Sequence, residues 1–230
     1  KPDGFMDEMT RGMAEAFFRD CIGNTYEQYS EIINVTSEFH LIDLAEYSRA
    51  SLKEYFDGES IVKIDSDIKE PIEGKLVFIM KKQFSQVFGD ILMGSDGTEP
   101  TEEMESSYVQ AITESLKRLS SSALEGKFTD LTSHQFRLNV NDGISIQVDD
   151  SFDPDLTDEI IMCHLRMVSV IEPPEGKQEF EFYFLSSHEY IKKINPENIS
   201  KYIKIQPPAQ ETAQAVEEPA AVAEPVTPSL

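Results

Sequence analysis

Few residues of this sequence have the types and the spacing that common catalytic chemistry requires. Gly74-Lys75 and Gly176-Lys177 each place a lysine after a glycine, but both lack the upstream glycine of a phosphate-binding P-loop. No GxGxxG motif of the dinucleotide-binding folds is present. We therefore expect no nucleotide-binding loop and no cofactor.

Metal ligation is not indicated either. His188-Glu189 is not followed by a second histidine at helical spacing, as a zinc protease would require, and the remaining histidines are scattered. The aspartate-rich stretch around Asp153 does not fit a calcium-binding EF-hand loop. Asp158 stands where that loop needs its central glycine, and His164 stands where it needs its terminal glutamate. We expect no metal site.

The charge of the chain restricts its partners. Lysine and arginine number 20 against 43 aspartates and glutamates, which gives a formal net charge of −23. Such a chain repels nucleic acids and anionic lipid surfaces, so a basic protein partner fits better, unless the charge serves solubility alone. No apolar run has the length of a membrane span, about 18 residues. The cysteines Cys21 and Cys163 form no disulfide pattern, so we expect a cytoplasmic protein.

The hydrophobic pattern predicts alternating helices and strands. A helix over 7–20 is expected to stop at Cys21-Ile22-Gly23-Asn24. Further helices are predicted over 41–56, 83–93, 101–124 and 187–194. Strands are predicted over 32–35, 60–67, 75–80, 136–140, 144–148, 160–171 and 180–185. Asn141-Asp142-Gly143 is a strong turn signal and predicts a hairpin between its flanking strands.

The order of these elements repeats along the chain and indicates an internal duplication, with halves over 5–97 and 98–205. Hairpin-length connections predict a mostly antiparallel sheet flanked by long helices, so the domain over 1–205 is classed as α/β (α+β). From Gln206 the sequence becomes rich in Ala, Pro and Glu and has no aromatic residue. Residues 206–230 are therefore predicted to be a disordered tail or linker.

Three segments together resemble a known family. Lys75–Met80 reads as a strand that leads into a helix ending in Leu-Met-Gly-Ser-Asp-Gly at 92–97, and a later helix contains Ala-Ile-Thr-Glu at 111–114. This arrangement resembles the CheC/CheX/FliY family of chemotaxis phosphatases and flagellar switch proteins. The helix around Met9–Phe17 is similar to the second, pseudo-symmetric copy of the motif helix. The resemblance spans most of residues 5–200.

The resemblance implies a chemistry and the residues that would carry it. Members of the family hydrolyse the aspartyl phosphate of the response regulator CheY, with a motif glutamate that contacts the regulator and an asparagine that orients water. Glu114 lies at the glutamate position, but Lys117 lies at the asparagine position. Lysine accepts no hydrogen bond from water. Catalysis is therefore expected to be lost.

The other motif copy is degenerate as well. Phe5 and Glu8 occupy its two positions in one register, and Cys21 and Asn24 occupy them in another, where Gly23 is expected to end the helix. A simpler role for Glu114 is an exposed helix residue paired with Arg118.

Three hypotheses remain open for the function. The first is a FliY-like flagellar switch or chemotaxis protein with a non-catalytic CheC-like domain, whose partners are CheY or switch proteins and whose tail leads to a FliN-like domain. The second is an active CheY-phosphate phosphatase that uses Glu114 with Glu8 or Lys117. The third is an acidic adaptor unrelated to this family.

Overall fold

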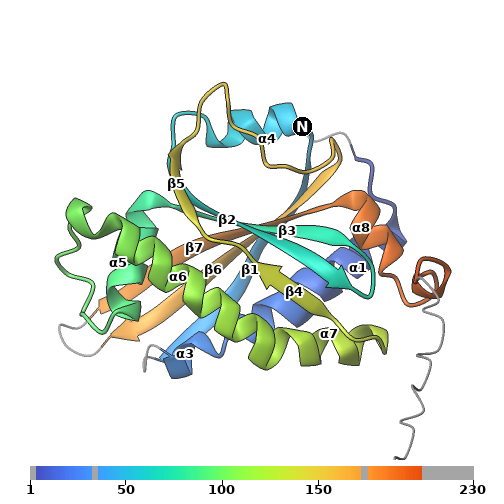
Figure 1. Cartoon of the computed structure of the whole chain (residues 1–230), viewed down its shortest axis with the longest axis horizontal. Coiled ribbons are helices and arrows are strands. Elements are labelled where there is room, and N and C mark those ends of the chain that lie inside the picture. The colour runs from blue at the N-terminus through green and yellow to red at the C-terminus, as the bar shows by residue number, and fades with distance from the viewer. Residues whose placement is uncertain (1–3, 33–35, 172–175, 204–230) are drawn as a thin grey trace, which may run out of the picture.

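The computed structural model describes residues 4–32, 36–171 and 176–203. Its centre is a seven-stranded antiparallel sheet in the order β1-β6-β7-β3-β2-β4, with β5 also paired to β2 (Figure 1). The strands are β1 (Thr36–Tyr47), β2 (Ser60–Glu70), β3 (Gly74–Lys81), β4 (Arg137–Val140), β5 (Ile144–Gln147), β6 (Ile160–Ile171) and β7 (Gly176–Ser187). The predicted tail over 206–230 lies outside the described residues.

Helices lie on both faces of this sheet. They are α1 (Glu8–Glu15), α2 (Asn24–Tyr26), α3 (Tyr29–Ile32), α4 (Arg49–Phe56), α5 (Lys82–Leu92), α6 (Glu105–Leu119), α7 (Glu125–Thr132) and α8 (His188–Lys193), with short 3₁₀ turns over Glu102–Met104 and Ile199–Lys201. Within the described part of the chain, no helix is long and apolar enough to cross a membrane.

The alternation of side chains along β7 divides the core into two parts. Phe180, Phe182 and Phe184 point to the face that is covered by the long helices, where they join the larger apolar cluster. Tyr183 and Leu185 point to the opposite face and pack in a smaller cluster with side chains of α4. The larger cluster fixes the positions of the long helices relative to the sheet.

Helices α1 and α6 are each continued by a π-helical segment, so that each belongs to a longer helical run. The segment Ala16–Gly23 joins α1 to α2, and Ser120–Leu124 joins α6 to α7. The predicted stop at Cys21–Asn24 is therefore wrong. Gly23 has helical dihedral angles (φ −56°, ψ −51°) and is buried, so the helix continues through it. The second helix likewise runs past its predicted end at Leu124 and stops at Ser133, which has φ 60°.

The prediction for residues 32–56 was wrong in part. Ile32 ends helix α3 rather than beginning a strand, and residues 33–35 lie outside the described residues. Residues 41–47 belong to strand β1, and the helix there is α4 alone. The Oγ of Ser48 accepts the backbone N–H of Ser51 and caps α4, so the helix begins only at Arg49.

The predicted hairpin around Asn141-Asp142-Gly143 is also wrong in its pairing. β4 and β5 exist at the predicted positions, but both pair with β2 and run antiparallel to it. They form one interrupted strand along the same edge, and the backbone N–H of Asn141 donates to the carbonyl of Asp65 between the two pieces (2.9 Å). The turn signal thus marks a break in a strand, not a reversal of the chain.

The remaining predictions of elements were confirmed. Strands β2, β3, β6 and β7 and helices α5 and α8 lie where the sequence placed them. An antiparallel hairpin followed by a helix occurs twice, as β2-β3-α5 and as β6-β7-α8. The two hairpins meet at the centre of the sheet, where Phe78 of β3 pairs with Phe184 of β7. The α+β class and its repeated order are those that the pattern predicted.

Candidate functional site

Helix α6 positions both residues of the predicted motif. Val109, Ile112 and Leu116 are buried on the face toward the sheet, because they recur at helical spacing. Glu114 and Lys117 lie one turn apart on the opposite side, with side chains 61% and 37% exposed. The motif positions therefore point away from the core toward solvent.

An ion-pair cluster occupies these two positions. Glu114 Oε1 lies 3.0 Å from Lys117 Nζ, and Asp142 Oδ1 lies 3.5 Å from the same nitrogen. The hydrogen bond that Lys117 donates to Glu114 is the main cause that raises the pKa of Lys117, so the lysine is a cation at neutral pH. Among the described residues, the ion pair of Glu114 is formed with Lys117, not with Arg118 as expected.

Beside this cluster runs a groove between α6 and the interrupted strand. One part of about 260 Å³ is lined by Val109, Gln110, Thr113, Glu114, Asp142 and Gly143, together with Ser106. A second part of about 440 Å³ continues toward Glu105 and Ser145. Gly143 forms the floor, because a Cβ there would lie 2.7 Å from Thr113 Oγ1. The strand passes α6 this closely only because glycine has no side chain.

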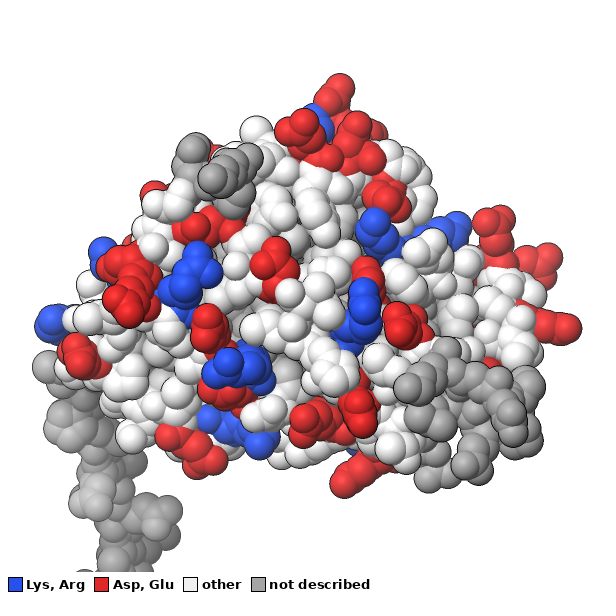
Figure 2. Space-filling view, turned by 180° about the vertical axis from the view of Figure 1, so that it is seen from behind, with Lys and Arg blue, Asp and Glu red and all other residues white. Residues whose placement is uncertain are grey.

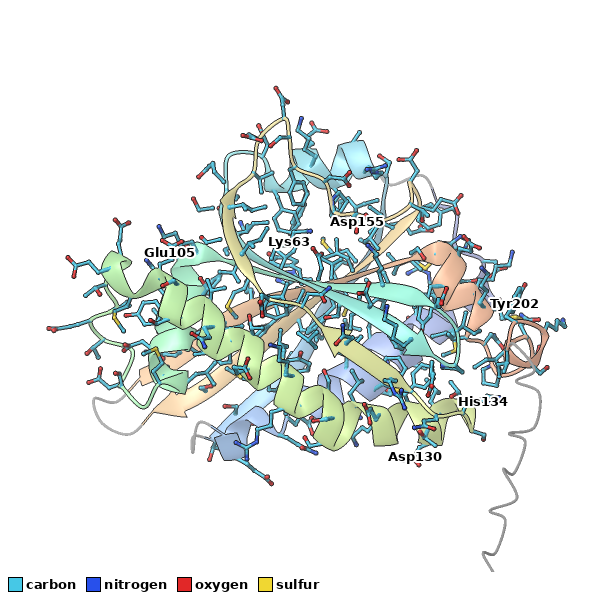
Figure 3. All side chains as sticks on the ribbon, viewed as in Figure 1. Lys63, Glu105, Asp130, His134, Asp155 and Tyr202 are labelled. Atoms are coloured by element: carbon cyan, nitrogen blue, oxygen red, sulfur yellow. The ribbon has the colours of Figure 1, made fainter. Side chains whose placement is uncertain are left out.

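A second polar cluster, which was not predicted from the sequence, lies around Glu105 at the start of α6 (Figure 3). Glu105 accepts a hydrogen bond from the hydroxyl of Ser145 and lies 3.1 Å from Lys82 Nζ. The bond from Ser145, followed by that from Lys82, lowers the pKa of Glu105. These residues come from α6, β5 and α5. Only the helix N-terminus, which favours acidic residues, could have indicated Glu105.

The positions predicted for the other motif copy do not form a comparable site. Phe5 is half-buried, and its ring contacts that of His188 with centroids 4.9 Å apart. Glu8 is exposed at the first residue of α1 and does not line the groove beside Glu114. Cys21 is buried, which raises its pKa to about 12, while Asn24 on the next turn is half-buried. No glutamate–asparagine pair exists at either register.

His188 and His164 each lie beside a glutamate carboxylate. His188 Nδ1 lies 2.8 Å from Glu159 Oε2, and His164 Nε2 lies 3.3 Å from Glu181 Oε2. No group of histidine, cysteine and carboxylate side chains within the described ranges could hold a metal ion. On the face opposite to that of Figure 1, lysine and arginine are interspersed with acidic residues and form no continuous basic patch (Figure 2).

Comparisons with known proteins identify the fold. No protein-family model matches the chain, and no curated protein matches it. Among solved structures, FliY of Thermotoga maritima is similar with a TM-score of 0.71 at 19% identity, covering 86% of this chain and 99% of that one.

The middle domain of the flagellar protein FliM from H. pylori is similar with a TM-score of 0.59 at 11% identity, covering 82% of this chain and 98% of that one. The structure of a FliG–FliM complex from H. pylori matches with a TM-score of 0.56 at 11% identity, covering 85% of this chain and 100% of that one. The chain therefore has the CheC-like α+β fold of the CheC/CheX/FliY fold family, as the motif helix and the glycine-containing loop predicted.

Proposed function

We propose that this chain is a FliY-like component of the flagellar motor switch or of the chemotaxis system, in the cytoplasm, whose CheC-like domain binds other proteins and does not hydrolyse phosphate. The observation that carries the proposal is the ion pair between Glu114 and Lys117 at 3.0 Å. It occupies both motif positions on α6, the glutamate position with a neutralised carboxylate and the asparagine position with a cation.

Lysine is a poor replacement for the motif asparagine. Its ammonium group has three donors and no acceptor, whereas an amide both donates to and accepts from a water molecule. The ammonium group of Lys117 moreover donates hydrogen bonds to Glu114 and Asp142, so it is held by side chains of the protein itself. Orienting an attacking water is most of what phosphoryl transfer requires from this family's motif. The site therefore keeps a surface for binding and lacks the group for catalysis.

A second candidate function is an active phosphatase with nonstandard residues. Lys117 favours it to some degree, because an ammonium ion can hold a phosphoryl group as a point charge. Glu8 gives it no support, since it does not line the groove that contains Glu114. An adaptor unrelated to the family is disfavoured by the fold, which is shared with FliY.

The partners follow from the proposed role. A FliG–FliM complex from H. pylori contains a chain that shares this fold. We expect this chain to bind a switch protein of that kind or CheY. The loop after α5 is one exposed element that offers apolar surface, since the side chain of Met93 is 46% exposed there. We further expect residues 1–205 to be the CheC-like domain and residues 206–230 to link it to a FliN-like domain.

Loss of phosphate from phosphorylated CheY tests the proposal. We expect the wild-type chain to leave the rate of phosphate release at the rate of CheY alone, while titration still detects binding to CheY or a switch protein. Lys117→Asn, which restores the family pair with Glu114, is expected to raise that rate. A wild-type turnover that Glu114→Ala abolishes would overturn the proposal in favour of the active phosphatase.

A further inference from the structure

Strand β5 forms an open edge of the sheet. Its residues pair with Ser60–Lys63 of β2 on one side, and no described strand pairs with the other side. Every second residue of such an edge presents its backbone N–H and C=O groups outward, where they can pair with another extended chain. β4 runs alongside helix α6 (Figure 1), and β5 contacts the first part of the same helix. The open edge therefore borders the groove described above.

This edge lacks the features that protect edge strands. The sequence of β5 is Ile-Ser-Ile-Gln, with no charged residue and no proline. The opposite edge of the sheet, β1, has a register shift between Leu41 and Asp43 and carries several acidic side chains along its length. Since bulges and charges discourage added strands, β5 is the better acceptor of the two edges.

The groove between β5 and α6 is lined by acidic side chains. Its ionisable lining residues are Glu105, Glu114 and Asp142. Lys82 and Lys117 neutralise part of this charge, but the carboxylates outnumber these lysines, and Asp142 is 97% exposed. Cationic side chains of a partner are therefore favoured here, within a chain that is strongly acidic as a whole.

The other face of the same edge is apolar. Successive residues of a strand point to opposite faces, and the hydroxyl of Ser145 points to α6, where it donates to Glu105. Ile144 and Ile146 therefore point to the face away from α6. Ile144 is 49% exposed, so it offers apolar surface to a partner on this face. A partner strand would meet carboxylates on one face and exposed isoleucine on the other.

We propose that the edge of β5 binds an extended segment of a partner protein in which basic and apolar residues alternate. The segment would add a strand to the sheet, with its basic side chains toward Glu105 and Glu114 and its apolar side chains against Ile144. This inference deepens the proposed binding role of the α6 edge and rests on that role, but it does not depend on the absence of catalysis.

The peptide Lys-Val-Lys-Val-Lys-Val is a suitable probe, because its length of about six residues matches a typical strand. Its binding to the full chain is measured by fluorescence anisotropy against two controls. Glu-Val-Glu-Val-Glu-Val has the opposite charge, and Lys-Pro-Lys-Pro-Lys-Pro has the same charge but cannot form a strand ladder. We expect the lysine–valine peptide to bind more tightly than both, and to protect the amides of Ile144–Gln147 from hydrogen exchange.

Variants of the chain locate the binding. Glu105→Gln and Glu114→Gln are each expected to weaken binding of the lysine–valine peptide by about 1.4- to 5-fold, the range that corresponds to exposed charge pairs. Ile144→Ser should also weaken it. Glu54→Gln removes an exposed carboxylate of α4, away from the groove, and should change nothing.

Equal binding of the lysine–valine and lysine–proline peptides would overturn the proposal. Protection from hydrogen exchange that is confined to the amides of β1 would overturn it as well. The phosphate-release assay is independent of these results. A chain that hydrolyses CheY phosphate and still binds the peptide at β5 would refute only the proposed loss of catalysis.

Discussion

Replacing Gly143 by alanine tests whether the interrupted strand is held against α6 as closely as the structure indicates. An added Cβ would lie 2.7 Å from Thr113 Oγ1 and 2.9 Å from the Cγ1 atoms of Ile64 and Val109. Real Cβ contacts are longer than these distances, and all three neighbours are buried. The strand or the helix must therefore shift. Overpacking of this kind costs about 1–3 kcal/mol in the free energy of unfolding.

Gly126→Ala is the matched control for this change. Gly126 lies within helix α7, and a Cβ there would meet no atom within 4 Å. Alanine is preferred over glycine in a helix by about 0.5–1 kcal/mol, so this variant should be more stable than the wild type. The same change from glycine to alanine is thus expected to lower the free energy of unfolding at position 143 and to raise it at position 126. The difference depends only on the surroundings of each Cα.

Urea unfolding followed by far-UV circular dichroism measures both effects. We expect the midpoint to fall for Gly143→Ala and to rise for Gly126→Ala, with unchanged m-values. Val109→Ala removes one of the atoms that the new Cβ would meet, so the cost of Gly143→Ala should be smaller in that background. A Gly143→Ala variant as stable as the wild type would refute the close approach and, with it, the described shape of the groove.

Three further predictions concern His164, the two cysteines and the cap of α8. Burial, outweighing the opposing effect of Glu181, lowers the pKa of His164, so the unfolded state binds the proton first as pH falls below about 6.5. The free energy of unfolding should therefore decrease as the pH falls through this range, and His164→Gln should make it depend less on pH. An unchanged slope of the free energy of unfolding against pH would contradict the assignment to His164. Burial raises the pKa of Cys21 to about 12 and also raises that of Cys163, so neither thiol should react with iodoacetamide at neutral pH until the protein unfolds. Ser187→Ala removes the cap that accepts the backbone N–H of Tyr190 at 3.1 Å, and thermal unfolding should show a loss of about 1 kcal/mol.

Local patterns predicted the buried strands and the shorter helices well. Continuous apolar runs such as Leu76–Met80 are typical of a strand covered on both faces, and β3 is such a strand. The serine before His188 predicted the start of α8, and its side chain does cap that helix. In these cases the residues that decide the structure are close together in the sequence.

Predictions failed where a distant segment decided the outcome. Gly23 reads as a helix stop, yet the π-helical segment continues through it, because residues of this segment pack against α7 and the neighbouring core. Residues 41–47 belong to β1, which pairs with β6, a strand that follows more than a hundred residues later in the chain. Such tertiary constraints override local propensity.

The candidate site shows the same division between local and distant information. The spacing of Glu114 and Lys117 is a property of one helix, so their pairing could have been anticipated, although Arg118 was the expected partner. Asp142 could not have been added to the pair, because Asn141-Asp142-Gly143 is the sequence of a hairpin turn. In the structure this turn sequence instead allows the strand to break, and glycine lets the break pass beneath Thr113. The break brings a carboxylate to Lys117 and leaves β5 as an open edge beside α6. The contact of Asp142 with Lys117 and the edge that we propose to receive a partner strand therefore depend on the same glycine.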